Sequence, residues 1–322
     1  MPFSKKHPPV QPIRDLVKSL AHTAEQPLVP GTSFGVYELQ RQIASGGTAA
    51  IFEALRAPDN KKVALKILHA HLAADPTFLA RFEQEAKIAA SLSHPNIVSV
   101  YEYGVVDGRH FIVMEYIDGF SLDDAIVKLK TVPCAAAAAI AAKACGALGF
   151  AHACNILHRD VKPGNIIVGR TGEVKVTDFG FSRVLDNPNT RLTVHNRVVG
   201  TPMYMSPEQI EGGSVTFSTD VFSLGTVLYF LVTGVPPFAG SGALAIMKKI
   251  IDGDYAQPRK INRKVPRKFQ EIIVQCLERD RSLRYESMAE LKSALDGFLM
   301  DARVESTEKG IGALVNLFNN AS

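Results

Sequence analysis

Four polar residues whose side chains could serve phosphate chemistry lie near the middle of the sequence. Asp160, Lys162 and Asn165 stand together in the segment HRDVKPGN, and Asp178 follows in the triplet DFG. Carboxylate and amide oxygens gathered in this way suit hard divalent cations, above all Mg²⁺, which binds few protein oxygens together with substrate phosphates. A single triplet means little, but this order with Lys162 and Asn165 in between indicates a site for magnesium and a phosphate-bearing substrate.

A predicted β-hairpin positions these residues. The segments NIIV (165–168) and EVKVT (173–177) have the composition of two short strands, and the glycines at 169 and 172 predict a turn between them. Asp160 and Asn165 stand at the mouth of the first strand, and Asp178 follows the second. A hairpin therefore brings all three oxygen-bearing side chains to one end of one small sheet.

A second candidate site precedes the hairpin, in a run of predicted strands. Three strand-like segments, 37–44, 48–55 and 61–68, follow each other, and Ser45-Gly46-Gly47 joins the first two. Adjacent glycines let backbone N–H groups approach an anion without interference from Cβ atoms. An ordinary hairpin turn explains this loop equally well. Lys66 favours the anion site, because an inward lysine in an apolar strand needs an anionic partner.

A predicted helix could supply that partner. The segment Pro76–Leu92 carries apolar residues at helical spacing, and Glu85 lies beside the apolar face. A Lys66–Glu85 ion pair is geometrically feasible, although a solvent-facing glutamate is the alternative. Two more strands, 97–104 and 110–117, flank an Asp107-Gly108 turn. Five strands and one helix thus predict a small α+β lobe, with a connector from Glu115 to Gly119.

The remainder of the chain is predicted to be mostly helical. The expected helices are Leu122–Lys130, Ala135–Cys154, Val221–Gly234, Gly242–Ile251, Pro266–Arg279 and Ser287–Phe298. Residues 301–322 form a tail in which Ile311–Phe318 could make about two helical turns. Residues 1–36 carry proline breaks around one short amphipathic piece, Ile13–Leu20, and predict a flexible N-terminal arm.

The composition narrows the classes of function. Hydrophobic residues make up 46% and charged residues 21%, which indicates sizeable cores, and a net charge of +4 is too small to favour nucleic acid or a membrane surface. We expect a cytoplasmic protein without a signal peptide or a membrane span, because no apolar run reaches about 18 residues. The four cysteines, at 134, 145, 154 and 276, are expected to be reduced and buried. A zinc site at His152, Cys154 and His158 is disfavoured by their spacing.

The ordered motifs resemble those of the protein kinases, most closely the bacterial members of the eukaryotic-type Ser/Thr kinases. The resemblance runs from about Tyr37 to about Phe298 and rests on VALK, QEA, HPNIV, MEYIDG, HRDVKPGN, DFG, GTPMYMSPEQ and STDVFSLGTVLYFLVTGVPPF. It implies a bilobal α+β fold, with a small lobe at 37–116 and a larger, mostly helical lobe at 117–300. It also implies transfer of the γ-phosphoryl group of ATP to Ser/Thr hydroxyls of protein substrates.

The resemblance assigns roles to particular residues. Asp160 would orient the acceptor hydroxyl, Lys162 would neutralise charge on the moving phosphoryl group, and Asn165 and Asp178 would hold Mg²⁺. The implied ATP-binding residues are Ile43, Gly46, Gly47, Ile51, Ala64, Lys66, Glu85, Met114, Glu115, Ile117 and Ile167. In that set Ile43, Ile51, Ala64 and Ile167 enclose the adenine, and plain core packing would explain any one of them. Glu115 and Ile117 offer backbone hydrogen bonds, and Met114 is the gatekeeper.

Regulatory and architectural roles follow from the same resemblance. Arg159 would need an anion, which phosphorylation of Thr193, or else of Thr190, could supply through self-association and trans-autophosphorylation. An ordinary solvated threonine is the alternative. Thr201 would lie on the substrate side of the catalytic residues. Further expectations are a buried Glu208–Arg284 ion pair, a tie from Asp220 to the catalytic loop and a structural His158.

Two departures from the family pattern stand out. Ala44 and Ala49 occupy the first and third positions of the glycine-rich loop, so we expect a stiffer loop and weaker ATP binding. Gly164 replaces a more usual Ala or Glu, with no evident chemical consequence. The altered loop keeps a pseudokinase scaffold as the alternative function. A small-molecule phosphotransferase is a weaker alternative, because it would not need the segment GTPMYMSPEQ.

Overall fold

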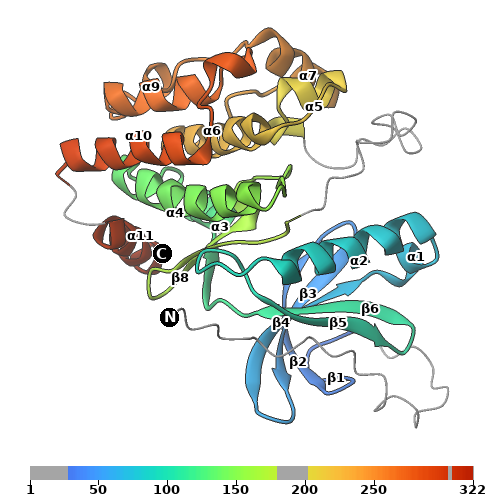
Figure 1. Ribbon diagram of the computed structural model, residues 1–322. Helices are drawn as coiled ribbons and strands as arrows, with labels where there is room; N and C mark the ends of the chain where they lie inside the picture. The colour runs from blue at the N-terminus through green and yellow to red at the C-terminus, as the bar shows by residue number, and fades with distance from the viewer. Residues whose placement is uncertain (1–27, 180–201, 304–306, 322) are drawn as a thin grey trace, which may run out of the picture. The chain divides into compact units, whose positions relative to one another are not determined.

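The computed structural model describes residues 28–179, 202–303 and 307–321 (Figure 1). The chain forms two compact units. The first unit runs to Ser93 and takes in Val98–Tyr116, and the second contains His94–Ile97 and the chain from Ile117 onward. The amphipathic piece predicted near the N-terminus lies outside the described residues.

The first unit is built on a six-stranded antiparallel sheet with the order β1-β2-β3-β4-β6-β5. Its strands are β1 (Ser33–Phe34), β2 (Tyr37–Ser45), β3 (Ala49–Arg56), β4 (Lys61–Leu68), β5 (Val100–Val106) and β6 (Arg109–Glu115). The prediction of five strands was one short, because β1 pairs with β2 and buries Phe34. The end of the predicted arm therefore belongs to the sheet. Two residues are too short a run to show a period of two in the sequence.

The turn between β5 and β6 has the predicted form. Asp107 and Gly108 have φ values of 49° and 74°, and Val106 pairs with Arg109 on either side of them. Two left-handed residues in a two-residue loop match the right-handed twist of the flanking strands, and Asp-Gly tolerates this conformation. The turn fixes the register that aligns β6 with β4 in the middle of the sheet.

The described part of the first unit contains two helices. The predicted helix is α2 (Pro76–Ser91), whose N-cap residue Asp75 accepts a 2.8 Å hydrogen bond from the Thr77 backbone N–H. A proline at the first helical position and a capping aspartate are strong start signals. The side chains of Phe82, Glu85 and Ala86 are buried. The short helix α1 (Ala70–Ala73) was not predicted, because four residues cannot show a helical period.

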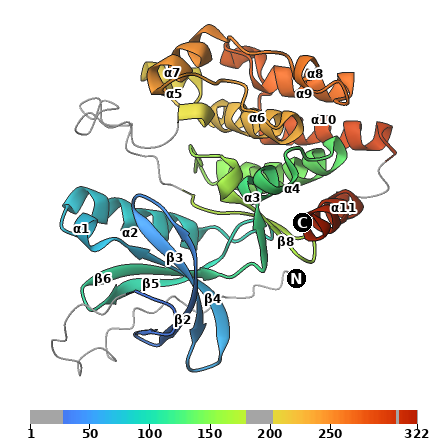
Figure 2. The ribbon, with the colours of Figure 1, turned by 180° about the vertical axis from the view of Figure 1, so that it is seen from behind.

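The second unit is mostly helical, with one small sheet (Figure 2). The sheet has the order β7 (Gly119–Ser121), β8 (Ile166–Gly169), β9 (Val174–Val176), so the predicted hairpin is present as β8 and β9. The helices are α3 (Leu122–Leu129), α4 (Cys134–Ala153), α5 (Pro207–Glu211), α6 (Phe217–Thr233), α7 (Ala243–Asp252), α8 (Pro258–Ile261), α9 (Arg267–Cys276), α10 (Met288–Asp301) and α11 (Thr307–Asn320). The short helices α5 and α8 were not predicted as separate elements.

Helix α4 is the core helix of the second unit. By length and composition it could cross a membrane, although Lys143 interrupts its apolar run, and 67% of its apolar stretch is buried inside the unit. It packs against α10, α11 and α6, and its alanines allow close approach of these helices. Cys145 is buried in this core, as is Cys276 of α9, whereas Cys134 is only partly buried. Cys154 is exposed, contrary to prediction, because the helix ends just before it.

The tail forms a longer helix than expected. Helix α11 spans 14 residues instead of about two turns, and it buries Ile311 and Leu314 completely. The ring of Phe318 stacks on Phe120 of β7 with centroids 3.7 Å apart and planes at 9°. Lys143 of α4 and Glu308 form an ion pair at 3.0 Å. These contacts make α11 an integral part of the second unit.

Candidate active site

Lys66 and Glu85 form a buried ion pair in the first unit. Lys66 lies in the middle of β4, paired with Ile51 of β3 and Ile112 of β6. Its Nζ lies 2.6 Å from Glu85 Oε1 on α2, and the two side chains are 4% and 5% exposed. The predicted ion pair is therefore confirmed. Removing either partner would leave an uncompensated buried charge, at a cost of about 3–5 kcal/mol.

The glycine-containing loop lies between β2 and β3. The Gly46 N–H donates to the Ala49 carbonyl oxygen at 3.0 Å and closes the turn. Neither Gly46 nor Gly47 has a positive φ, and a Cβ added at Gly47 would meet no atom within 4 Å. Folding of the unit thus does not require glycine at Gly47, and its backbone is open to an approaching group. Ala49 belongs to β3, where it pairs with Leu68 and is 5% exposed.

The predicted adenine residues of the first unit lie on adjacent strands. Ala64 of β4 pairs with Met114 of β6, and both side chains are buried. Ile51 on β3 is half-buried, and Ile43 on β2 is 42% exposed. The Glu115 N–H donates to the Ser99 carbonyl at 2.8 Å, and the predicted backbone hydrogen bond from Glu115 to the adenine stays a prediction.

Two predicted adenine residues belong to the second unit. Ile117 is the first residue of the long segment of that unit, and Ile167 lies in β8, where Ser121 of β7 pairs with it. Both side chains are half-buried. A partly exposed apolar residue such as Ile167 is a suitable wall for a flat apolar ring, whereas Ile117 is predicted to contribute its backbone. Their contact with a nucleotide stays a prediction.

Asp160, Lys162 and Asn165 are held together in the second unit. Lys162 Nζ lies 2.6 Å from Asp160 Oδ2, and these side chains are 39% and 35% exposed. Asn165 Nδ2 donates to the Asp160 backbone oxygen at 2.9 Å and to its Oδ2 at 3.2 Å. The carboxylate is therefore oriented by neighbours but open to solvent, as a group that must meet a substrate hydroxyl requires.

The hairpin brings Asp178 next to Asn165. Asn165 closes a one-turn 3₁₀ helix (Pro163–Asn165) just before β8, and the Thr177 N–H after β9 donates to the Asn165 carbonyl at 3.0 Å. Asp178 comes next and has a φ of 63°, a left-handed conformation that aspartate adopts more readily than most residues. The Asn165 Nδ2 bonds fix the amide so that its Oδ1 serves as an acceptor. The Asn165 amide oxygen and the Asp178 carboxylate are oxygen donors of the kind that magnesium takes, and their binding of the ion stays a prediction.

Asp220 of α6 holds the backbone at the start of the catalytic loop, which is the segment HRDVKPGN at residues 158–165. Its carboxylate is fully buried and accepts hydrogen bonds from the His158 N–H at 2.9 Å and the Arg159 N–H at 2.8 Å. Its Oδ2 also lies 2.7 Å from His152 Nε2. Burial alone would raise the pKa of the Asp220 carboxyl, but the hydrogen bond and charge of His152, together with His158, hold that pKa below its usual value. The predicted tie to the loop is confirmed.

His158 has a structural place. It is fully buried, its Nε2 lies 2.9 Å from the Thr177 carbonyl oxygen, and its ring packs against Phe179 with centroids 4.7 Å apart. Because a carbonyl oxygen only accepts, the His158 Nε2 carries a proton and donates it in this bond. His158 thus joins the catalytic loop to the segment that carries Asp178, and its buried ring is not placed to act as a base on a substrate.

Asp123 is a residue near the catalytic loop that sequence reasoning missed. A Cβ added at Gly164 would lie 2.8 Å from Asp123 Oδ2. Burial, and then the neighbouring charge of Asp124, raise the pKa of the Asp123 carboxyl, against the effect of Lys162. Gly164 therefore has a consequence that the sequence did not reveal: it leaves room for this carboxylate. One signal could have pointed to Asp123. Of the two adjacent aspartates, Asp124 forms the capping box with Ser121, so Asp123 has no role in capping this helix.

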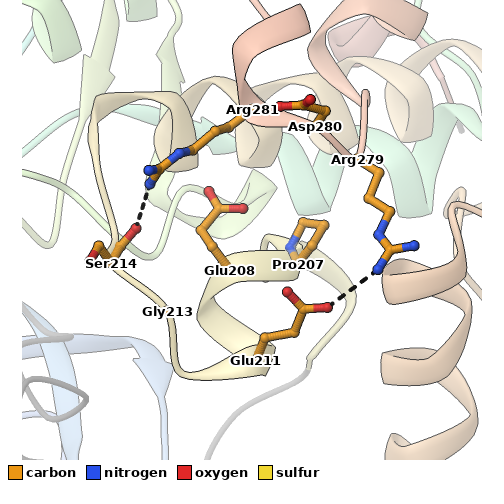
Figure 3. Close-up of a pocket in the computed structure, with 8 residues that line it drawn as sticks. All are labelled: Pro207, Glu208, Glu211, Gly213, Ser214, Arg279, Asp280 and Arg281. Carbon is orange, nitrogen blue, oxygen red and sulfur yellow. Dashed lines mark hydrogen bonds and ion pairs between the residues drawn. The ribbon is translucent and has the colours of Figure 1, made fainter.

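Glu208 and Arg284 form the predicted ion pair, with Nη1–Oε1 and Nη2–Oε2 distances of 2.9 and 3.0 Å. A pocket of about 340 Å³ lies beside Glu208. Figure 3 shows Arg279 paired with Glu211 and Arg281 donating to the Ser214 carbonyl at the pocket rim. None of its lining residues belongs to the predicted site.

Thr190, Thr193 and Thr201 lie outside the described residues.

These features are the parts of a protein kinase domain. One part is the sheet with its buried lysine–glutamate pair, and the other is the helical unit with its Asp-Lys-Asn loop and the aspartate that follows. Residues 37–295 match the family model described as "Protein kinase domain", and the chain belongs to this family.

The chain is similar to bacterial serine/threonine-protein kinases. A probable serine/threonine-protein kinase of Clostridium perfringens is 37% identical over 273 residues, covering 85% of this chain and 40% of the relative. Serine/threonine-protein kinase PrkC of Bacillus subtilis is 38% identical over 266 residues, covering 81% and 41%. The chain thus spans about two fifths of the length of these relatives. The crystal structure of the Mycobacterium tuberculosis PknI kinase domain superimposes with a TM-score of 0.64 at 25% identity, covering 84% of this chain and 99% of that domain.

Proposed function

We propose that this chain is an ATP-dependent protein serine/threonine kinase, with its kinase domain at residues 37–300. The observation that carries the proposal is the arrangement of Asp160, Lys162 and Asn165, in which a solvent-accessible carboxylate is fixed by a cation 2.6 Å away and by an amide. The reaction breaks the bond between the γ-phosphorus and the β,γ-bridging oxygen of ATP. A bond forms from the acceptor hydroxyl oxygen to that phosphorus, the bridging oxygen leaves with ADP, and the hydroxyl loses its proton.

Asp160 would orient the hydroxyl and accept its proton. An aspartate is a weak base, but phosphoryl transfer has a loose transition state in which positioning and charge stabilisation supply most of the rate. Lys162 would stabilise negative charge on the moving group. Magnesium, when bound, neutralises charge on the phosphates of ATP, and Asn165 and Asp178 are the residues that would hold it.

The first unit would hold the nucleotide. Lys66, kept in place by Glu85, would contact the α- and β-phosphates, and the loop at Gly46 and Gly47 would lie against the phosphates with the open backbone of Gly47. Ile43, Ile51, Ala64 and Ile167 would enclose the adenine, and the backbone of Glu115 and Ile117 would bond to it. A serine or threonine acceptor is supported by the lysine in HRDVKPGN and by the names of the similar proteins.

Regulation by phosphorylation is part of the proposal. Arg159 precedes the catalytic aspartate, and a phosphate on Thr193 or Thr190, added by a second copy of the chain in the cytoplasm, would give it an anionic contact. The altered glycine loop favours a second candidate, a pseudokinase scaffold that binds nucleotide or partners without efficient catalysis. The intact Lys66–Glu85 pair and the complete Asp160 loop favour the active enzyme.

The decisive experiment incubates the purified protein with Mg-ATP and a generic protein substrate and maps phosphate by mass spectrometry. We expect phosphate on the substrate and on Thr193 or Thr190 with the wild type, and none with Asp160→Ala. Asp254→Ala removes an exposed carboxylate elsewhere in the second unit and is the matched control, expected to behave as the wild type. A folded wild-type protein that binds ATP but phosphorylates neither itself nor the substrate would favour the pseudokinase.

A further inference from the structure

A short segment of the second unit concentrates positive charge. Residues 258–268, PRKINRKVPRK, contain six Lys and Arg and no Asp or Glu. The whole chain has 36 cationic and 32 anionic residues, so without this segment it would have 30 against 32. The positive excess of the chain therefore resides in this segment, and we call its six cations the basic surface.

Buried residues between the cations hold the basic surface in place. Pro258 opens α8, Val265 precedes α9, and Phe269 lies in its first turn, and all three side chains are buried. Asn262 Nδ2 also donates to the Val232 carbonyl at the end of α6, at 2.7 Å. Charges mounted on an anchored backbone are preorganised for a partner, because less freedom is lost on binding.

Most of the basic surface lacks counter-charges among the described residues. Arg267 pairs with Glu271 at 3.0 Å and Lys268 with Asp301 at 2.5 Å. The other four cations, which are exposed, form no ion pair with any part of the chain that the structure describes; they are Arg259, Lys260, Arg263 and Lys264. Uncompensated like charges so close together repel each other, and an anionic partner would relieve this repulsion.

Three of these unpaired cations surround a hollow of about 510 Å³. Its lining consists of Arg259, Lys260, Arg263, Gln257 and Gln270. The Gln270 Oε1 accepts a 3.0 Å hydrogen bond from the Arg259 backbone N–H, which orients its amide. A hollow lined by guanidinium, ammonium and amide groups offers donors to anions and little to an apolar ligand.

We propose that the basic surface docks an acidic segment, a run of Asp and Glu residues, of a protein substrate. This proposal rests on the proposed kinase function, since it names a feature of the substrate. A membrane surface is a poorer fit, because a lipid-binding face needs several apolar side chains, and Ile261 is the one exposed large apolar residue in the described segment 257–270. Figure 2 shows α8 and α9 on the far side of α6 from β8, which follows the catalytic loop.

Because the basic surface lies away from the catalytic loop, docking of an acidic segment should change only one of the two kinetic constants. An acidic segment held there would raise the local concentration of the acceptor at the active site without touching the reacting groups. Docking should therefore lower KM and leave kcat unchanged. Three exposed ion pairs together are expected to tighten binding roughly tenfold at low salt, and the gain should fade as salt screens the charges.

The test uses two fluorescent peptides with the same acceptor sequence, followed by a flexible linker and either five Glu or five Gln residues. Binding is measured by anisotropy, which needs no catalysis, and phosphorylation is measured in parallel. We expect the wild type to bind the Glu peptide roughly tenfold more tightly and with a correspondingly lower KM. Arg259→Gln/Lys260→Gln/Arg263→Gln should lose this preference while keeping kcat and the affinity for the Gln peptide.

A matched variant distinguishes docking at the basic surface from an effect of the protein's overall positive charge. Lys87→Gln/Lys292→Gln/Arg303→Gln removes three exposed cations outside the basic surface and should keep the preference. Equal binding of both peptides by the wild type would overturn the proposal, as would loss of the preference in both triple variants. Binding to phosphatidylglycerol vesicles without a preference for the Glu peptide would assign the surface to membranes instead. Preferential binding without phosphorylation would support the docking site and count against the kinase activity.

Discussion

The Glu208–Arg284 pair allows a quantitative test of the second unit. The Arg284 side chain is 0% exposed and the Glu208 side chain 12%. Arg284 also donates to the backbone oxygens of Glu278, Ser218 and Arg279. These three bonds hold the guanidinium in place whether or not its carboxylate partner is present. Glu208→Gln therefore leaves the buried Arg284 cation without its carboxylate, while glutamine keeps nearly the same side-chain shape as glutamate.

The expected cost follows from this environment. Breaking a buried ion pair by removing one partner costs about 3–5 kcal/mol, because an uncompensated charge stays buried. Glutamine keeps one oxygen that can accept from Arg284 and from Thr219, which donates to Glu208 Oε1 at 2.7 Å. We therefore expect Glu208→Gln to lower the free energy of unfolding by about 3 kcal/mol, at the lower end of that range.

Urea unfolding followed by far-UV circular dichroism measures this change, since the chain contains no tryptophan for fluorescence. With an m value of about 3 kcal/mol/M, the midpoint should fall by about 1 M. Glu271→Gln is the matched control: its partner Arg267 is 81% exposed and Glu271 60%, so it should lower the free energy of unfolding by less than about 0.5 kcal/mol. A Glu208→Gln effect no larger than that of the control would refute the reasoning.

The pH dependence supplies an independent check. Burial alone would raise the pKa of the Glu208 carboxyl, but the hydrogen bond and charge of Arg284 lower it below its usual value. A lowered folded-state pKa means that this carboxylate stabilises the protein fully above its unfolded-state pKa of about 4.3. The contribution disappears as the pH falls through the folded-state pKa. The stability difference between wild type and Glu208→Gln should thus be full at pH 7 and shrink in acid.

Three further predictions concern the packing of the second unit. Gly234→Ala should lower the free energy of unfolding by at least about 1–2 kcal/mol, measured by urea unfolding, because Gly234 has a φ of 75° and its new Cβ would lie 2.6 Å from the Lys130 carbonyl oxygen. Phe318→Ala removes the stack on Phe120, so amide hydrogen exchange in α11 should accelerate roughly fivefold or more; unchanged exchange would contradict the docking of this helix. Iodoacetamide followed by mass spectrometry should modify Cys154 first, since it is exposed while burial raises the thiol pKa of the two fully buried cysteines.

The sequence by itself determined the family and the local frame of the candidate site. The hairpin of β8 and β9 follows from strand-forming residues around two glycines, so the placement of Asn165 next to Asp178 needed no tertiary information. The partners of Lys66, Arg284 and the catalytic loop were also anticipated, because a buried charge demands a counter-charge and ordered motifs indicated which one. The metal, nucleotide and substrate roles of these residues stay predictions.

Only the tertiary structure decided the features that depend on residues far apart in the chain. The pairing of β1 with β2, the fit of Asp123 against Gly164 and the docking of α11 on Phe120 leave no periodic signal in a single segment. The exposure of Cys154 depends on where α4 ends. The sequence alone shows the cluster of cations in the basic surface. Only the structure shows that Glu271 and Asp301 pair with two of them. Burial and charge pairing are set by neighbours in space, and a local pattern cannot specify those neighbours.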